Sequence, residues 1–324
     1  MSHAIMLRAF GGPEALSWEP ESVADPGEGE IAVRHTAVGV NFIDVYQRTG
    51  LYPIALPACL GREAAGVVEA VGKRVRGFRV GDRVLYLSVG VGSYRERRNV
   101  PADRAFRLPE QISDQTAAAM MLKGLTAWYL LRRTYRVRKG DPIVVHAAAG
   151  GVGLILCQWA RHLGARVIGI VGSDDKAVLA RKHGCHATFI PGREDWVAGV
   201  RKLTGGAGAA VVYDSVGKDT FSQSLDALRP LGLMVSYGNS SGPVPPVAPL
   251  ELARRGSLFL TRPTLDHYVP TPAALEGAVR ELFAIVKSGK VKIRIGQSYA
   301  LKDAAVAHRD LEARHTTGST VLIP

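Results

Sequence analysis

The glycine-rich segment Val145–Leu154 constrains the fold of this 324-residue chain more than any other feature. It follows an apolar run at 143–147 and opens an apolar helical segment at 152–163. A glycine-rich turn between a strand and a helix is typical of a dinucleotide fingerprint, although Ala147 stands where the first glycine is usual. Because a helix N-terminus offers free N–H groups and a partial positive charge to phosphates, the segment predicts a nucleotide site.

The chain around this turn alternates strands with helices. From about residue 123, strands are expected at 143–147, 166–171, 209–214, 233–237 and 257–261, with helices at 152–163, 176–183 and 220–228. This order predicts an α/β fold with a Rossmann doubly wound parallel sheet that has helices on both faces. Before residue 123, short β-like runs separated by Gly and Pro predict a sheet-rich domain. A helix at 272–288 and a closing strand at 321–323 are expected to follow.

The composition excludes several classes of protein. The chain has 41 Lys and Arg against 29 Asp and Glu, a net charge of +12, which favours anionic partners such as phosphorylated cofactors, acidic substrates or nucleic acid. Its three cysteines lie far apart and predict neither a disulfide framework nor a zinc site of four thiolates. No apolar run approaches the roughly 20 residues that span a bilayer, and no secretory signal is evident, so we expect a cytoplasmic protein without membrane contact.

The residues that follow the second expected strand indicate which nucleotide binds. An Asp or Glu at that strand end would hydrogen-bond a ribose hydroxyl and favour NAD, but this chain has Gly172 and Ser173 there. These small residues leave room for a 2′-phosphate, which Lys176 would neutralise. Asp174 and Asp175 would favour NAD if they turned inward, but they are interpreted as first-turn helix residues. We therefore favour NADPH over NADH.

Several motifs together resemble a known superfamily. The turn at 147–153 and the segment Tyr213–Gly217 resemble the medium-chain dehydrogenases/reductases. The segments at 38–46, 61–66 and 237–242 resemble its zinc-free quinone oxidoreductase branch, the zeta-crystallin-like enzymes, and the similarity covers essentially the whole chain.

The resemblance implies a domain organisation and a reaction. A GroES-like β-rich catalytic domain is implied at 1–122, a Rossmann NADPH-binding domain at 123–262, and a C-terminal segment at 263–324 that returns to the catalytic domain. The implied reaction is NADPH-dependent reduction of a quinone by hydride transfer in the interdomain cleft. Zinc is not expected, because Asn41 and Arg62 stand where the zinc-dependent relatives have their Cys and His ligands.

The resemblance also assigns site residues. Asn41 and Tyr46 are the catalytic candidates at the nicotinamide end, and Thr126, expected to begin a helix, lies on the nicotinamide side. The pyrophosphate would be held by Ala149, Gly150, Gly151 and Val152, and the adenosine ribose phosphate by Gly172, Ser173 and Lys176. The rest of the cofactor would meet Ser215, Val216, Gly217, Tyr237, Gly238, Asn239, Ser240, Leu260, Thr261, Arg262 and Arg314. Pro191–Gly192 departs from the family, whose members commonly have Tyr or His there, and Arg193 is a candidate to compensate.

Some alternatives stay open. Tyr46 either donates a hydrogen bond to the acceptor or anchors the cofactor, while Asp44, Arg62 and Lys123 are interpreted mainly as structural. The same site would also suit an enal or enone reductase. An NADPH-sensitive RNA-binding role is a different possibility, because the resemblance includes some zeta-crystallin-like proteins that bind RNA and the chain is basic. A homodimer is implied by the superfamily, with the strand at 258–260 as the pairing edge.

Overall fold

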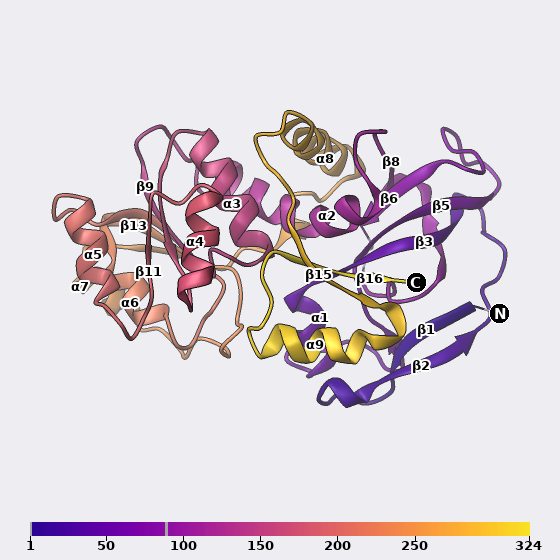
Figure 1. The fold of residues 1–324 in the computed structure, drawn as a ribbon, viewed down its shortest axis with the longest axis horizontal. Helices are drawn as coiled ribbons and strands as arrows, with labels where there is room; N and C mark the ends of the chain where they lie inside the picture. The colour runs from indigo at the N-terminus through magenta and orange to yellow at the C-terminus, as the bar shows by residue number, and fades with distance from the viewer. Residues whose placement is uncertain (1, 88–89) are drawn as a thin grey trace. The chain divides into compact units, whose positions relative to one another are not determined.

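The computed structural model describes residues 2–87 and 90–324, which form two compact units (Figure 1). The first unit comprises Met1–Lys123 and Ile293–Pro324, and the second comprises Gly124–Lys292. Each unit has its own sheet and its own core, so each is described by itself.

The second unit contains a six-stranded parallel sheet in the order β11-β10-β9-β12-β13-β14. The strands are β9 (Pro142–His146), β10 (Arg166–Ile170), β11 (Ala187–Phe189), β12 (Ala209–Asp214), β13 (Leu228–Ser236) and β14 (Phe259–Thr261). Because β10 and β12 flank β9 on opposite sides, the strand order reverses there. In sheets of this kind, ligands bind outside the carboxyl ends of the strands at such a reversal.

Helices cover both faces of this sheet. The helices α3 (Gly151–His162) and α4 (Asp174–Lys182) lie on one side, and α5 (Trp196–Leu203) and α6 (Phe221–Asp226) lie on the other (Figure 1). The α5–α6 side contains a core in which Trp196 and Phe221 pack with Val144, Ile168 and Val212 of the strands. These strand residues come from positions that face one side of the pleat, as a buried sheet requires. The predicted doubly wound parallel sheet is confirmed.

The first unit is rich in β-structure, as predicted. Its larger sheet has the order β15-β16-β3-β5-β6-β8, with β7 also paired to β3, and a second sheet has the order β2-β1-β4. The strands are β1 (Ser2–Leu7), β2 (Leu16–Glu21), β3 (Glu30–Val40), β4 (Ala58–Cys59), β5 (Glu63–Val71), β6 (Arg83–Leu87), β7 (Arg97–Pro101), β8 (Ala105–Arg107), β15 (Ile295–Ala300) and β16 (Ser319–Ile323). The helices α1 (Phe42–Arg48) and α9 (Ala304–Glu312) also belong to this unit, as does the part of α2 (Asp114–Tyr129) up to Lys123. The expected closing strand is β16, which pairs with β3.

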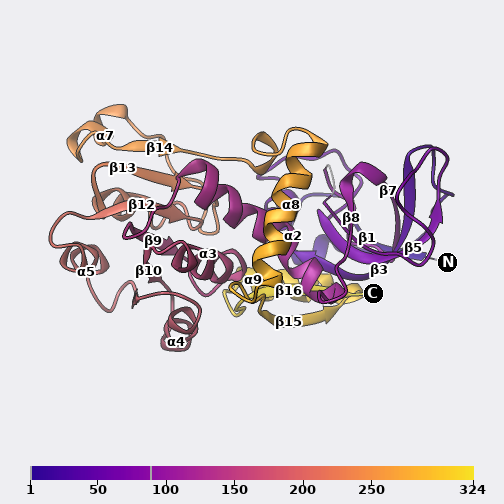
Figure 2. The same cartoon turned by 90° about the horizontal axis from the view of Figure 1, so that it is seen from above.

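The C-terminal part of the chain divides later than predicted. The expected change at residue 263 falls instead at Ile293, because helix α8 (Pro272–Lys287) belongs to the second unit. There α8 lies beside the part of α2 that begins at Gly124 and belongs to the same unit (Figure 2). A Cβ on Gly124 of α2 would lie 2.5 Å from Leu282 of α8, so the glycine allows the two helices to approach closely. The short helix α7 (Pro249–Arg254) precedes β14.

No helix within residues 2–87 and 90–324 is long and apolar enough to cross a bilayer. The cytoplasmic location stays a prediction.

Candidate functional site

The second unit gathers five predicted site segments at one edge of its sheet. Each segment follows, or forms, the carboxyl end of a parallel strand, and parallel strands end at the same edge. The five segments are Ala149–Val152 after β9, Gly172–Lys176 after β10, Ser215–Gly217 after β12, Tyr237–Ser240 after β13, and Leu260–Arg262 at β14. Residues far apart in the sequence therefore form one candidate site.

The glycine-rich turn connects β9 to α3 by a tight backbone path. Ala147 adopts a positive φ of 48°, and the Gly150 N–H donates to its carbonyl oxygen at 2.9 Å. Helix α3 begins at Gly151, with Gly150 as its N-cap residue in extended conformation. The N–H groups of the first turn have no partner within the helix, so they are available to an anion at this position.

The residues predicted to receive the adenosine phosphate lie at the start of α4. Ser173 caps this helix, and its hydroxyl accepts a hydrogen bond from the Lys176 N–H at 3.4 Å. A Cβ on Gly172 would meet no atom within 4 Å, so the space above it is open. Arg193, the candidate for compensating Pro191–Gly192, lies nearby, because its guanidinium donates to the Asp174 carboxylate at 2.6 Å. Both signs of charge therefore occur at this helix end.

The loops after β12 and β13 form one hydrogen-bonded platform. The Ser240 N–H donates to the Ser215 carbonyl at 3.2 Å, and the Ser241 N–H donates to the Val216 carbonyl at 2.8 Å. Gly238 allows this contact, since a Cβ there would lie 2.5 Å from the Ser215 carbonyl oxygen.

Beyond this platform, the Arg262 guanidinium donates to the Ser236 carbonyl at 2.8 Å. Asn239, Leu260 and Arg262 also line a hollow of about 290 Å³ together with Phe221 and Val244.

Two predicted residues need a different placement. Thr126 does not begin a helix, because α2 runs through it from Asp114 to Tyr129. The expected helix start at Thr126 came from the resemblance alone, whereas the helix begins twelve residues earlier, at Asp114. Arg314 follows α9 in the first unit with a φ of 60°, so it lies outside the five segments.

The catalytic candidates of the first unit lie at the start of α1. Asn41 is buried and precedes the first residue of α1, and its side-chain N–H donates to Glu63 Oε1 at 2.7 Å. The other oxygen of Glu63 accepts from the Leu122 N–H at 2.6 Å, and the Lys123 ammonium lies 3.6 Å from Oε1. The buried Glu63 therefore fixes the Asn41 amide, because an acceptor-only carboxylate must face the amide nitrogen.

The other catalytic candidate, Tyr46, lies one turn further along α1. It is also buried, and its ring contacts those of Phe42 and Tyr52.

Asp44, also on α1, makes the stability of the first unit depend on pH. Burial raises the pKa of its carboxyl to about 7, although hydrogen bonds from the Asn41 N–H and the Tyr94 hydroxyl oppose the shift. Between about pH 4 and pH 7 the folded protein therefore keeps a proton here that the unfolded chain has lost. The contribution of this proton to the free energy of unfolding is fully present below the pKa of Asp44 in the unfolded chain. It is lost as pH rises through about 7.

We expect the wild type to lose stability relative to Asp44→Asn as pH rises from 5 to 8. The measurement is urea unfolding of both proteins at several pH values. A difference in stability between the two proteins that stays constant from pH 5 to pH 8 would contradict the raised pKa of Asp44.

Two groups of buried polar residues in these regions were not predicted as site residues. Glu63 was not singled out, although a glutamate after Gly61-Arg62 at the start of a buried strand is an available signal. Asp214 and His146 were also missed, and each is the last residue of a central parallel strand. A polar residue at that position of a buried strand indicates the ligand-binding edge.

Comparison with known proteins places the chain in a family. Residues 27–110 match the alcohol dehydrogenase GroES-like domain, and residues 151–272 match the zinc-binding dehydrogenase domain. A quinone oxidoreductase of Pseudomonas aeruginosa is 50% identical over the full length of both chains. The 2-haloacrylate reductase of a Burkholderia species is 44% identical over 100% of this chain and 99% of that protein. The structure of Escherichia coli quinone oxidoreductase complexed with NADPH matches with a TM-score of 0.97 and 48% identity, covering 100% of both chains.

The chain belongs to the quinone oxidoreductase family. The resemblance seen in its motifs is thereby confirmed, as is the combination of a Rossmann fold with a GroES-like domain. Although residues 151–272 match a domain described as a zinc-binding dehydrogenase, residues 2–87 and 90–324 contain no cluster of three or more His, Cys, Asp or Glu suited to a metal ion.

Proposed function

We propose that this protein reduces quinones by hydride transfer from NADPH without using zinc. The observation that supports this proposal most directly is full-length similarity to quinone oxidoreductases, one of which was solved with NADPH at 48% identity. In this proposal the first unit holds the catalytic residues and the second unit binds the cofactor.

The second unit has the features that NADPH requires. The α3 N-terminus would receive the pyrophosphate, and the open space above Gly172 would admit the adenosine ribose with its phosphate. Lys176 and Arg193 would provide positive charge to the 2′-phosphate, which is what distinguishes NADPH from NADH. Thr126, the platform after β12 and β13, and Leu260–Arg262 would position the nicotinamide half, and Arg314 is proposed as a further contact. NADPH, when bound, supplies the hydride.

The first unit would control the acceptor. Reduction places negative charge on a quinone oxygen, and a hydrogen-bond donor beside that oxygen stabilises the charge. Tyr46 is proposed as that donor, with Asn41 orienting the carboxamide or the acceptor. Glu63 would hold Asn41 in one amide orientation during this step.

Zinc independence is supported by the chemistry of the donor set. The Asn41 amide nitrogen donates to Glu63, and the Lys123 ammonium lies against the same carboxylate. Asparagine and lysine do not form a tetrahedral zinc site, and the ammonium already neutralises the glutamate.

A second candidate function is reduction of activated alkenes. The 2-haloacrylate reductase that matches over the full chain supports it, because that name denotes an electron-poor carbon–carbon double bond as acceptor. No comparison bears on the RNA-binding alternative, which stays a prediction.

A steady-state assay tests the function. Chelated, purified protein would be supplied with NADPH or NADH, and with 1,4-benzoquinone, 9,10-phenanthrenequinone, trans-2-hexenal or 2-chloroacrylate. We expect oxidation of NADPH that depends on quinone and persists after metal chelation. Turnover restricted to the alkenes would favour the second candidate, and loss of activity on chelation would contradict zinc independence.

The cofactor preference is tested by Lys176→Met in the same assay. A charge-assisted contact contributes about 1.5–3 kcal/mol, so we expect the KM for NADPH to rise at least about tenfold. The KM for NADH should stay nearly unchanged because NADH lacks the 2′-phosphate. Equal effects on both cofactors would remove Lys176 from the phosphate site.

We also propose that the protein forms a homodimer through β14. This strand is the last of its sheet, and Phe259 and Leu260 are 59% and 38% exposed. An edge strand with exposed apolar residues is suited to pairing with a second copy. Light scattering should give a mass near twice 34.7 kDa. A monomer mass at micromolar concentration would contradict the dimer.

A further inference from the structure

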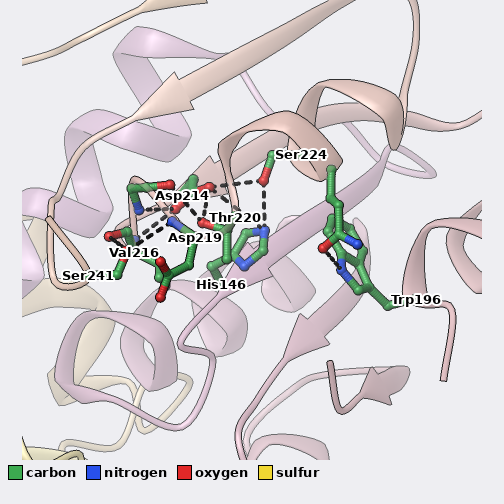
Figure 3. Close-up of polar contacts among 10 residues, drawn as sticks. His146, Trp196, Asp214, Val216, Asp219, Thr220, Ser224 and Ser241 are labelled. Carbon is green, nitrogen blue, oxygen red and sulfur yellow. Dashed lines mark hydrogen bonds and ion pairs between the residues drawn. The ribbon is translucent and has the colours of Figure 1, made fainter. Parts of the chain in front are cut away.

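Asp214 is the centre of a buried polar network at the reversal point of the second unit's sheet (Figure 3). It is the last residue of β12 and is fully buried. One carboxylate oxygen, Oδ1, accepts from the backbone N–H groups of Val216 at 2.7 Å and Gly217 at 3.1 Å. The other, Oδ2, accepts from the hydroxyls of Thr220 at 2.7 Å and Ser224 at 2.9 Å. A single side chain therefore connects the loop after β12 to helix α6.

The network continues to the strand that leads into the glycine-rich turn. His146, the last residue of β9, places its Nε2 atom 2.9 Å from the Ser224 hydroxyl. Burial lowers the pKa of this histidine, although the Asp214 charge opposes the shift, so its ring is neutral near pH 7. Since Ser224 gives its proton to the Asp214 carboxylate, the histidine must donate from Nε2. The network thereby ties the ends of the neighbouring strands β9 and β12 together.

The loop held by Asp214 in turn supports the loop after β13. The Val216 carbonyl accepts from both the backbone N–H and the hydroxyl of Ser241, each at 2.8 Å. The Ser241 hydroxyl oxygen also accepts from the Asp219 N–H at 3.1 Å. Displacement of Val216 would therefore move Ser241 and the platform to which it belongs. In Figure 3 these contacts can be followed from Asp214 through Val216 to Ser241.

We infer that Asp214 is a positioning residue for cofactor binding, acting through the Val216 and Gly217 amides on both loops of the platform. The inference rests on the proposed function, because the platform is assigned to the nicotinamide half of NADPH. Asp214 itself is fully buried, so it acts on the cofactor only through the backbone that it holds. A carboxylate that accepts four hydrogen bonds fixes this backbone more firmly than a neutral group would.

The test uses a graded series of the full-length protein: wild type, Asp214→Asn and Asp214→Ala. Asparagine keeps one acceptor oxygen for the two amides but loses the charge, whereas alanine removes all four bonds. Hydrogen exchange of the Val216 and Gly217 amides, measured without NADPH, should accelerate at least threefold in the asparagine variant and more in the alanine variant. The Kd for NADPH from calorimetry should rise in the same order, by at least tenfold for alanine. In turnover, the KM for NADPH should rise more than kcat falls.

Trp196→Phe is the matched control. Trp196 is buried in the same unit, donates to Gln223 of α6 at 3.0 Å and packs edge-on against the His146 ring, which a phenylalanine can still do. Among the described residues, it makes no hydrogen bond to the platform. The control should lower the urea midpoint without changing exchange at Val216 and Gly217 or the Kd for NADPH.

The outcomes separate the two proposals. The inference is overturned if the asparagine variant, which is expected to fold, matches the wild type in exchange and Kd. It is also overturned if Trp196→Phe weakens NADPH binding as much for the same loss of stability. A wild type that does not bind NADPH would instead refute the proposed function, together with the cofactor part of this inference. If the alanine variant does not fold, the asparagine variant still decides.

Discussion

Replacing Gly153 with alanine is expected to destabilise the second unit and to abolish tight NADPH binding. Gly153 lies in the first turn of α3, directly against the strand-to-helix turn. A Cβ there would lie 2.8 Å from the Cα and carbonyl carbon of Ala148, and closer still to the Ala147 carbonyl oxygen. All of these are backbone atoms, which cannot rotate away as a side chain would. The helix must therefore move away from β9, at a cost on the order of 3 kcal/mol.

The measurement combines urea unfolding with calorimetric titration of NADPH. Gly277→Ala is the matched control, since it makes the same chemical change in α8, where a Cβ would meet no atom within 4 Å. Because alanine has the higher helix propensity, this control should gain about 0.5–1 kcal/mol and bind NADPH normally. A Gly153→Ala protein with wild-type stability and affinity would refute the steric argument.

The second large effect is expected from Glu63→Ala in the first unit. Glu63 is fully buried and accepts from the Asn41 amide and the Leu122 N–H, beside the Lys123 ammonium. Its removal leaves the ammonium of Lys123 buried with the Val40 carbonyl, at 2.8 Å, but without the carboxylate with which it forms its ion pair. An uncompensated buried charge costs about 3–5 kcal/mol, so we expect a loss of that size in the free energy of unfolding.

A double-mutant cycle with Lys123→Met separates the charge from the packing. If the ammonium is responsible, the double variant should be more stable than Glu63→Ala alone. Glu69→Ala is the control on the same strand, because Glu69 pairs with Arg34 and Arg97 at the surface and should cost no more than about 1 kcal/mol. A loss below 1 kcal/mol in the free energy of unfolding for Glu63→Ala would show that the buried contacts of Glu63 contribute little to stability.

Elements of this structure could be predicted from the sequence where the pattern that indicates them lies within one short stretch of the chain. Strand β12 was predicted at 209–214, its observed bounds, because a continuous apolar run between turn residues is a local pattern. Strand β13 was predicted to begin at 233, but it begins at Leu228. Pro230 and Gly232 obscured its first half, since proline and glycine within a run argue against a central strand. Strand β11 and helix α5 were not predicted at all; β11 has only three residues, too few for a clear periodicity.

The residues of the candidate site likewise fall into those that a local sequence pattern could locate and those that it could not. The glycine-rich turn and the start of α4 could be located because strand, turn and helix follow one another directly in the chain. The cluster around Glu63 could not, because its partners Asn41 and Leu122 lie 22 and 59 residues away and meet only in the folded unit. Lys123 was interpreted mainly as structural, but its burial beside Glu63 was not foreseen, since a single sequence does not show the carboxylate that allows a lysine to be buried.

The positive φ of Ala147 implies that the glycines of a dinucleotide fingerprint differ in how strictly they are required. At position 147 the backbone is left-handed and the side chain is exposed, so a substitution costs conformational energy alone, roughly 1–2 kcal/mol. At position 153 any side chain collides with backbone, whatever conformation it adopts. A mutational library over this turn should therefore retain several small residues at 147 but only glycine at 153. Motif searches that demand glycine at both positions would overlook functional nucleotide-binding chains.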